Sequence, residues 1–211
     1  MSEIEEIILP ASERVSRELL YKDMPKPLNL TDVFGNDHPV ELEIGIGKGL
    51  FMAYTGLQHP ERNFIGIEIR RKYLSKALDR VEKRPLPNVR LCHGDAFAFM
   101  DEHLPDHCLS VIHLYFPDPW HKKRHHKRRL FDPEFLKLVR RTLVPEGQML
   151  IATDHKDYWE WITEVLNGQD FLEKTERLPE AAVGSKGLTN YEIKYQEEGR
   201  PIYRIGYRKV R

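Results

Sequence analysis

Cysteine, long apolar runs and net charge are all scarce in this chain of 211 residues. Two thiols, Cys92 and Cys108, are too few for a disulfide framework, and their spacing matches neither a CxxC redox pair nor a zinc ribbon. No apolar run approaches the roughly eighteen residues that a membrane span requires. The first twenty residues carry acids where a secretory signal carries positive charge. These absences predict a cytoplasmic protein without a membrane partner.

The absence of net charge hides an uneven distribution. The 33 basic and 33 acidic side chains cancel, which as an average argues against a polyanionic partner. Residues 121–129 (HKKRHHKRR) nevertheless hold six of the basic side chains and no acid, so the rest of the chain carries 27 basic against 33 acidic residues. Such a run is usually a solvated face. Here it follows a loop stiffened by Pro117 and Pro119, and we expect a localised patch that binds a polyanion.

The amino-terminal part differs in composition from the remainder of the chain. We predict a lead-in over residues 1–34 and one domain over residues 35–211. The first twenty residues fit either a short amphipathic helix that uses Val15, Leu19 and Leu20 or a poorly ordered arm. Residues 22–39 are rich in Pro, Asn, Asp and Gly, which predicts an extended segment closed by a turn, with the folded core starting after it.

Beyond this lead-in, short β-prone runs alternate with helical patterns. The strands are predicted at 40–44, 64–69, 89–92, 110–116, 147–154, 171–177 and 202–208, and the helices at 50–58, 70–84, 96–104, 133–143 and 158–166. In the third helix, Phe97, Met100 and Leu104 have the spacing of core residues, and a loop is predicted around 183–190. The alternation predicts an α/β fold with a mostly parallel seven-stranded sheet and helices on both faces. Ligands of such sheets bind at the carboxyl ends of the strands.

Glycines and acids stand at these strand ends. The first strand is followed by Gly45, Gly47 and Gly49, a GxGxG pattern that departs from the dinucleotide fingerprint GxGxxG. Alone it is weak evidence, since a tight turn after a strand needs the same residues. Glu68 ends the second strand, nineteen residues after Gly49, where an acid can accept hydrogen bonds from a ribose diol, and Asp95 follows the third strand.

Together these positions make residues 40–155 resemble the class I S-adenosylmethionine-dependent methyltransferases, which have a Rossmann-like fold. The resemblance implies S-adenosyl-L-methionine as the cofactor. It implies Glu43 and the three glycines near the methionine part, Glu68 at the ribose, and Asp95 with Ala96 near the adenine. Asp118, after the fourth strand, is assigned to the same cofactor site.

Three further motifs narrow the resemblance. The segment FPDPWHKKRHHKRR begins at Phe116, TD stands at residues 153–154, and TNYE stands at residues 189–192. With them the chain, from about residue 34 to 203, resembles the bacterial tRNA (guanine-N7-)-methyltransferases. The resemblance implies a tRNA partner, guanine 46 of the variable loop as the target, and a substrate site formed by Lys122, Asp154, Thr189, Asn190, Tyr191 and Glu192. We assign RNA contacts to the basic run, namely Lys123, Arg124, Lys127, Arg128 and Arg129.

The chemistry of this substrate indicates a role for Asp118. Guanine N7 carries an in-plane lone pair and can attack a methyl group without first losing a proton. The site therefore needs no general base, and its task is to place N7 in line with the methyl carbon. A carboxylate at Asp118 can accept hydrogen bonds from guanine N1–H and N2–H, which adenine lacks. We predict that Asp118 is a catalytic residue that acts by orientation and electrostatics.

The same motifs raise three other interpretations: a metal site, an amino-group methyltransferase and a non-catalytic RNA-binding module. His121 and His125 are four residues apart, but no HExxH motif follows and the surrounding cations repel a divalent ion, so no metal site is predicted. An amino-group methyltransferase acting on nucleic acid or protein would use a similar cradle with a (D/N)PP(Y/F/W) loop, whereas this chain has PDPW. A non-catalytic RNA-binding module on the same fold is the third possibility. The sequence leaves open whether the protein is a monomer or a homodimer.

Overall fold

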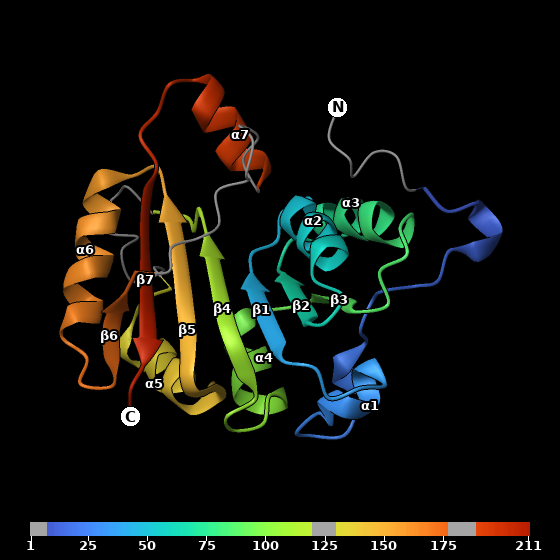
Figure 1. The fold of residues 1–211 in the computed structure, drawn as a ribbon, viewed down its shortest axis with the longest axis horizontal. Coiled ribbons are helices and arrows are strands. Elements are labelled where there is room, and N and C mark those ends of the chain that lie inside the picture. The colour runs from blue at the N-terminus through green and yellow to red at the C-terminus, as the bar shows by residue number, and fades with distance from the viewer. Residues whose placement is uncertain (1–7, 120–129, 177–188) are drawn as a thin grey trace.

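The computed structural model describes residues 8–119, 130–176 and 189–211. Its centre is a seven-stranded sheet with the order β3-β2-β1-β4-β5-β7-β6 (Figure 1). The strands are β1 (Val40–Ile44), β2 (Asn63–Glu68), β3 (Val89–His93), β4 (Leu109–Tyr115), β5 (Leu143–Thr153), β6 (Leu172–Thr175) and β7 (Tyr203–Lys209). Strands β1 to β5 pair in parallel, and β7 pairs antiparallel with both β5 and β6. The predicted mostly parallel seven-stranded sheet is confirmed.

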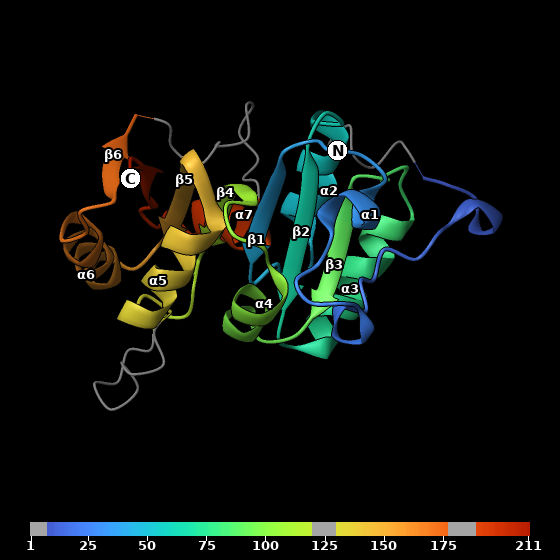
Figure 2. The ribbon, with the colours of Figure 1, turned by 90° about the horizontal axis from the view of Figure 1, so that it is seen from below.

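Helices cover both faces of this sheet (Figure 2). They are α1 (Leu30–Phe34), α2 (Leu50–Gln58), α3 (Arg71–Glu82), α4 (Ala96–His103), α5 (Pro133–Thr142), α6 (Lys156–Asn167) and α7 (Asn190–Glu197), with two short 3-10 turns at Ala11–Glu13 and Tyr21–Asp23. The buried side chains of α2 and α3 form one apolar cluster with β2 and β3. Those of α1, α4, α5 and α6 form a second, larger cluster. Two clusters that share no residue are what a sheet buried on both faces requires.

The amphipathic pattern of α3 is confirmed, whereas that of α4 was partly wrong. In α3 the residues Leu74, Ala77 and Val81 are fully buried, at the spacing of one helix face. In α4 the expected core residue Phe97 is 37% exposed, and the neighbouring Phe99 is buried instead. Met100 and Leu104 are buried as predicted.

The amino-terminal segment does not form the predicted helix over Val15 to Leu20, and this stretch lies instead along strand β3. Glu18 forms a parallel bridge with Leu91, and the Leu19 amide donates to the Leu91 carbonyl at 2.8 Å. Leu19 is buried, while Val15 and Leu20 are exposed. Because β3 is an edge strand with unpaired backbone groups, an extended segment beside it satisfies hydrogen bonds that a helix would leave unmade.

Residues 22–39 are also more ordered than an extended lead-in. The Asn29 side chain accepts a hydrogen bond from the Thr31 amide and starts α1, and Gly35 ends this helix with φ of 75°. Tyr21 and Leu28 are buried in the larger cluster, so the core does not start after residue 39 as expected. The division of the chain at residue 34 stays a prediction.

Neither a bilayer span nor a metal cluster is found in the described ranges. No helix there combines the length and the apolar character needed to cross a membrane. Residues 8–119, 130–176 and 189–211 also bring together no group of three or more His, Cys, Asp or Glu that could hold a metal ion. His121 and His125 lie outside these ranges.

The parallel strands all point their carboxyl ends toward one edge of the sheet. Helix α7 lies beyond the arrowheads of β4 and β5 at this edge (Figure 1). The segments that follow β1, β2, β3 and β4 meet there as well, so the fold brings the glycines and the acids noted in the sequence to one end of the molecule.

Candidate active site

The loop after β1 is shaped by its three glycines. Gly45, Gly47 and Gly49 have φ of 80°, 54° and 68°, a region that side-chain-bearing residues rarely adopt. The Gly49 amide donates to the Ile46 carbonyl at 2.9 Å, which closes the turn before α2. A Cβ on Gly49 would stand only 2.7 Å from the Cβ of Ala77. Gly49 therefore permits α3 to pack on the loop, whereas Gly45 and Gly47 face the cavity described next.

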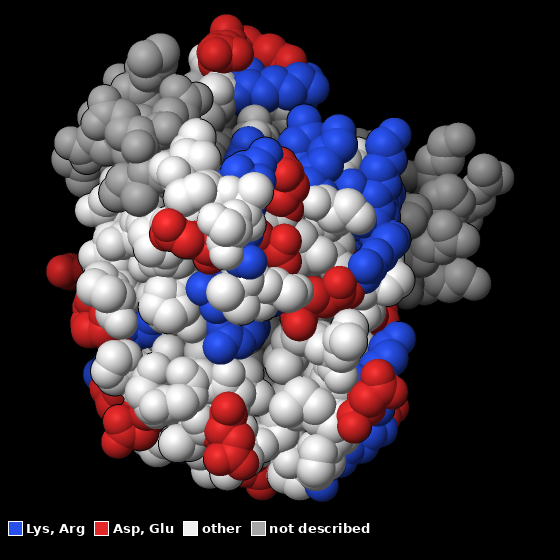
Figure 3. Space-filling model, turned by 90° about the vertical axis from the view of Figure 1, so that its right-hand side faces the viewer, with Lys and Arg blue, Asp and Glu red and all other residues white. Residues whose placement is uncertain are grey.

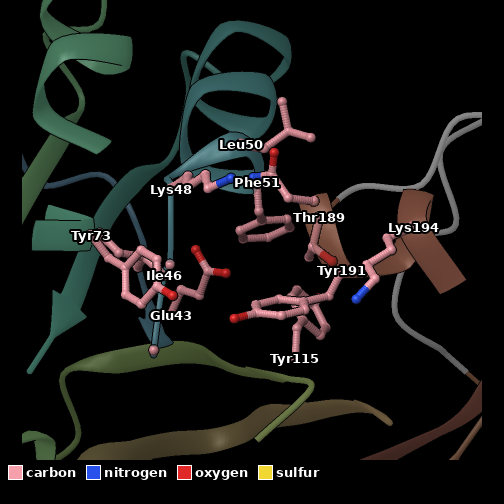
Figure 4. A pocket seen from close by; sticks show the side chains of 13 residues that line it. Glu43, Ile46, Lys48, Leu50, Phe51, Tyr73, Tyr115, Thr189, Tyr191 and Lys194 are labelled. Carbon is pink, nitrogen blue, oxygen red and sulfur yellow. The ribbon is translucent and has the colours of Figure 1, made fainter. Parts of the chain in front are cut away.

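A cavity of about 220 Å³ opens beside this loop (Figure 4). It is lined by the predicted residues Glu43, Gly45, Gly47, Thr189, Asn190 and Tyr191 and by residues that the sequence reasoning missed, which are Ile46, Lys48, Leu50, Phe51, Tyr73, Tyr115 and Lys194. These residues come from four places in the chain: the β1–α2 region, α3, the end of β4 and the start of α7. The missed residues share no motif. Only their closeness in the sequence to the glycines or to TNYE could have indicated that some of them line the cavity.

Glu43 is the most unusual group in the cavity. It is 2% exposed, and its Oε2 atom is buried without a hydrogen-bond partner among the described residues. Burial, with a smaller repulsion from Glu68, raises the pKa of Glu43 to about 8. Figure 4 shows its carboxylate pointing into the cavity. A buried carboxylate without a partner is costly unless a positive group binds to it, so the cavity is built for a cationic ligand.

Glu68 ends β2 directly behind the glycine loop. Its carboxylate accepts one hydrogen bond from the Gly47 amide at 3.0 Å and another from the Arg70 amide at 2.9 Å. These bonds fix the carboxylate at the turn between β2 and α3, where it is only 7% exposed. A carboxylate held in this way can also accept hydrogen bonds from a pair of ligand hydroxyls.

The third acid, Asp95, has a structural duty as well. Its side chain caps α4 by accepting from the Ala98 amide at 3.0 Å, and Ala96 begins the helix. Asp95 itself is exposed. Two large apolar side chains that follow the acids, Ile69 and Phe97, are 62% and 37% exposed. Exposed apolar groups next to hydrogen-bonding acids suit a flat aromatic ligand, a role that the sequence pattern does not indicate for either residue.

The TNYE motif is not the expected loop, because it starts helix α7. The Thr189 hydroxyl accepts from the Glu192 amide at 3.0 Å, and the Glu192 carboxylate pairs with Arg204 of β7. Thr-x-x-Glu is the capping-box spacing, which is the signal that could have predicted this helix. The cap fixes where α7 starts, and the ion pair ties the helix to the sheet.

Tyr191 of α7 lies over the glycine loop. A Cβ on Gly47 would be 3.8 Å from its ring. The ring centroid is 6.3 Å from that of Phe116 and 6.1 Å from that of Tyr195, and Tyr191 is 42% exposed. The three rings form an aromatic group of which Tyr191 lines the cavity, and a planar base could stack on it.

Asp118 and Asp154 follow β4 and β5 near this aromatic group. Phe116 leaves β4 with φ of 54°, which turns the chain sharply into the loop that carries the exposed Asp118. Burial raises the pKa of Tyr191, and several neighbouring groups add to the rise, Asp118 among them, so the two side chains are within electrostatic reach. Asp154 pairs with Arg200 at 3.0 Å instead of standing open to the cavity.

The basic residues assigned to substrate and RNA cannot be placed in the same way. Lys122, Lys123, Arg124, Lys127, Arg128 and Arg129 lie outside the described residues. Their proposed roles stay predictions from the sequence.

A buried network that the sequence did not indicate supports one wall of the cavity. His113 is 3% exposed, and its Nδ1 and Nε2 atoms lie 2.8 Å from the Tyr115 hydroxyl and 2.7 Å from the Glu41 carboxylate. Arg62 reaches the other oxygen of Glu41 at 3.2 Å. The ring of Tyr115 is thereby held against Phe51 in the cavity lining, with centroids 5.0 Å apart.

S-adenosylmethionine fits the donor set of this site. The unpartnered Glu43 carboxylate suits the ammonium group of its methionine part, and the glycine loop admits a ligand close to the backbone. Glu68 can accept from the ribose hydroxyls, and the apolar side chains beside Asp95 suit the adenine. One cationic end, one diol and one flat ring are the features that these groups would bind.

Comparisons with known proteins agree with this fit. The family described as "Putative methyltransferase" matches residues 37–205. The tRNA (guanine-N(7)-)-methyltransferase of Alkalilimnicola ehrlichii is 40% identical over 185 residues, which cover 87% of this chain and 78% of that protein. The protein of the same name from Rhodopirellula baltica is 39% identical over 197 residues, covering 89% of this chain and 72% of that protein.

Solved structures resemble the fold at lower sequence identity. The 16S rRNA methyltransferase KamB superposes with a TM-score of 0.63 at 14% sequence identity, and the match covers 93% of this chain and 100% of that chain. The aminoglycoside resistance methyltransferase NpmB1 superposes with a TM-score of 0.61 at 18% sequence identity, and the match covers 86% of this chain and 92% of that chain. At this identity the likeness supports the fold alone.

Proposed function

The chain belongs to the family of the tRNA (guanine-N(7)-)-methyltransferases, and from this membership we propose that it transfers a methyl group from S-adenosylmethionine to N7 of a guanine in tRNA. The observation that carries the proposal within the molecule is Glu43, a buried carboxylate with an unpartnered oxygen that faces the cavity beside a glycine loop. By the resemblance in its motifs, the target is guanine 46 of the variable loop. A tRNA substrate supports a cytoplasmic location.

In the proposed reaction, separate residues of this chain bind the separate parts of the cofactor. S-adenosylmethionine supplies the electrophilic methyl group when it is bound. Glu43 holds the ammonium end, Glu68 holds the ribose, and Asp95 with Ala96 borders the adenine. Gly45 and Gly47 let the ligand approach the backbone.

The substrate base would enter between α7 and the loop after β4. Tyr191 offers a ring for stacking, and Asp118 accepts from guanine N1–H and N2–H, which holds N7 in line with the methyl carbon. The bound cofactor would supply the methyl group to the lone pair of N7, so no residue of this chain has to remove a proton from the base. Asp118 also stabilises the positive charge that the guanine acquires. Asp154, with its partner Arg200, would border the same nucleotide.

Methyl transfer to N7 can be tested directly on RNA. The full chain is incubated with labelled S-adenosylmethionine and unmodified tRNA, and the product is treated with borohydride and aniline, which cleave the strand at N7-methylguanine. Cleavage at one guanine is the expected result. Label on an exocyclic amino group would support the amino-group methyltransferase, and RNA binding without label would support a non-catalytic module.

The basic run after Trp120 has a separate test. Binding to tRNA should weaken with salt, because each phosphate neutralised releases counterions, with a log–log slope of about 0.7 per contact on single strands. Replacing Arg124, Lys127 and Arg128 with Ala should flatten that slope and leave cofactor affinity unchanged. If the triple variant keeps the wild-type salt slope, the basic run does not contact RNA and is a solvated face.

A further inference from the structure

Helix α3 presents a row of positive charges that the proposed function leaves unused. Lys72, Lys76 and Arg80 are spaced by four residues and so lie along one face of the helix, and Arg70 is the residue just before the helix begins. Arg70, Lys72 and Lys76 are exposed. The segment from residue 69 to residue 78 contains four basic residues and no acid. Figure 3 shows Lys and Arg side chains gathered on the side of the molecule where α3 lies in Figure 1.

The nearby acids are already engaged by other groups. Asp79 pairs with Lys83 at 2.6 Å, and Glu18 pairs with Arg71. The Glu82 carboxylate accepts from the Arg17 amide at 2.9 Å. Among the described residues, Arg70, Lys72 and Lys76 have no ion-pair partner, so their charges are available to an external anion.

This row stands at a fixed position relative to the cavity. Arg80 donates from Nη1 to the carbonyl of Lys48 in the glycine loop at 3.0 Å, and the Cβ of Ala77 touches the backbone of that loop at Gly49. Tyr73, one residue after Lys72, lines the cavity itself. The helix and the glycine loop therefore form one packed unit, and the exposed charges of α3 flank the entrance to the site.

We propose that Arg70, Lys72 and Lys76 form a second RNA-contact surface, the α3 surface, which binds phosphates of the substrate tRNA. In the sheet order, β2 and its following helix lie on one side of β1, and β4 with the loop that carries Asp118 lies on the other. A tRNA whose guanine occupies the cavity extends backbone to both sides of it. The α3 surface neutralises the backbone on the β2 side, opposite to the start of the loop that carries Asp118. This inference rests on the proposed function for the identity of the polyanion.

Salt-dependent binding of unmodified tRNA to the full chain tests the α3 surface. The variant R70Q/K72Q/K76Q removes three charges from it. The control K26Q/K137Q/K174Q removes three exposed lysines from the segment before α1, from α5 and from β6, so the net charge changes equally. With about 0.7 to 0.9 per phosphate contact, the log–log salt slope of the α3 variant should fall by roughly 2 to 3, while that of the control stays near the wild-type value.

Two further measurements separate RNA contact from other causes. The Kd for S-adenosylmethionine, measured by calorimetry without RNA, should equal the wild-type value in K72Q/K76Q, a variant that keeps Arg70 over the ring of Tyr73 in the cavity lining. The KM for tRNA at moderate salt should rise roughly tenfold or more, with kcat at saturating tRNA nearly unchanged. A parallel loss of cofactor affinity would mean that the helix acts through the cofactor site and would overturn the proposal.

The outcomes also distinguish this inference from the proposed function. If the wild type methylates tRNA at N7 and the α3 variant keeps the wild-type salt slope, only the α3 surface is refuted. Equal slopes in the α3 variant and the control, both reduced, would reveal an effect of net charge and refute it as well. If the wild type neither binds nor methylates tRNA, both proposals fall together.

Discussion

Glu43 should report cofactor binding through its proton. Burial and the charge of Glu68 raise its pKa to about 8, so at pH 7 roughly nine-tenths of the unliganded protein carries it protonated. A cationic ligand beside it favours the ionised form. The α-amino group of the cofactor, with an ordinary pKa of about 7.7 to 8.0, takes up about 0.1 to 0.2 of a proton on binding. We therefore expect a net release of roughly 0.7 to 0.8 proton per cofactor bound at pH 7.

The measurement is a calorimetric titration of S-adenosylmethionine in buffers with different ionisation enthalpies. The slope of the observed enthalpy against buffer enthalpy gives the number of protons released. The variant Glu43→Gln has no proton to lose and should show only the small uptake by the ligand, together with weaker binding. Equal proton release by the wild type and the variant would refute the assignment of Glu43 to the ammonium group.

The same carboxyl predicts a pH dependence of stability without any ligand. Because its pKa is higher in the folded chain than in the unfolded one, its contribution is fully present below about pH 4.5 and is lost as the pH rises through about 8. The difference between 4.5 and about 8 corresponds to roughly 5 kcal/mol. The free energy of unfolding of the wild type, measured relative to Glu43→Gln by urea denaturation, should fall between pH 5 and pH 8.5. A constant difference would contradict the raised pKa.

Three other substitutions test separate parts of the structure. Asp118→Asn should slow single-turnover methyl transfer at saturating tRNA by roughly 100-fold, because an amide cannot accept both guanine donors, and a normal rate would rule out the orienting role. Gly49→Ala should lower the free energy of unfolding by about 2 to 4 kcal/mol, since its Cβ would meet Ala77 at 2.7 Å. The control Gly35→Ala, with a similar φ and no neighbour within 4 Å, should lower it by about 1 kcal/mol. Equal losses would show that the contact with Ala77 does not matter. His113→Phe should cost roughly 2 to 4 kcal/mol in urea denaturation, because the buried Glu41 carboxylate and the Tyr115 hydroxyl each lose one hydrogen bond, and a change below about 0.5 kcal/mol would contradict the network.

The sheet was predictable because each of its strands carries its own signal. Runs such as VELEI and FIGIEI are rich in β-prone residues, and α3 shows a clear apolar face, so local pattern and tertiary structure agree. The acids and glycines at strand ends were found for the same reason, since their position along the chain fixes their position at one edge of the sheet.

The parts that were missed depend on contacts between distant segments. The bridge between Glu18 and Leu91 is a single pairing without periodicity, and nothing around residue 18 indicates it. The network of Glu41, His113 and Tyr115 joins two neighbouring strands whose register cannot be read from either run. Helix α7 is the exception, because the spacing of Thr189 and Glu192 is a local signal for the start of a helix.

The position of β7 between β5 and β6 has a consequence for how the protein folds. Tyr203 pairs with Thr153, so the chain must close a loop of about fifty residues before β7 can enter the sheet. Helix α7 precedes β7 by only a few residues and is tied to it through Arg204. One wall of the cavity is thus completed by a contact of high sequence separation, the slow kind in folding kinetics. The pairing of β1 with β4, from Val40 to Leu109, spans an even longer separation, so two walls of the cavity depend on distant contacts, whereas the strands β1, β2 and β3 that precede the glycine loop and the acids pair with nearer neighbours in the chain.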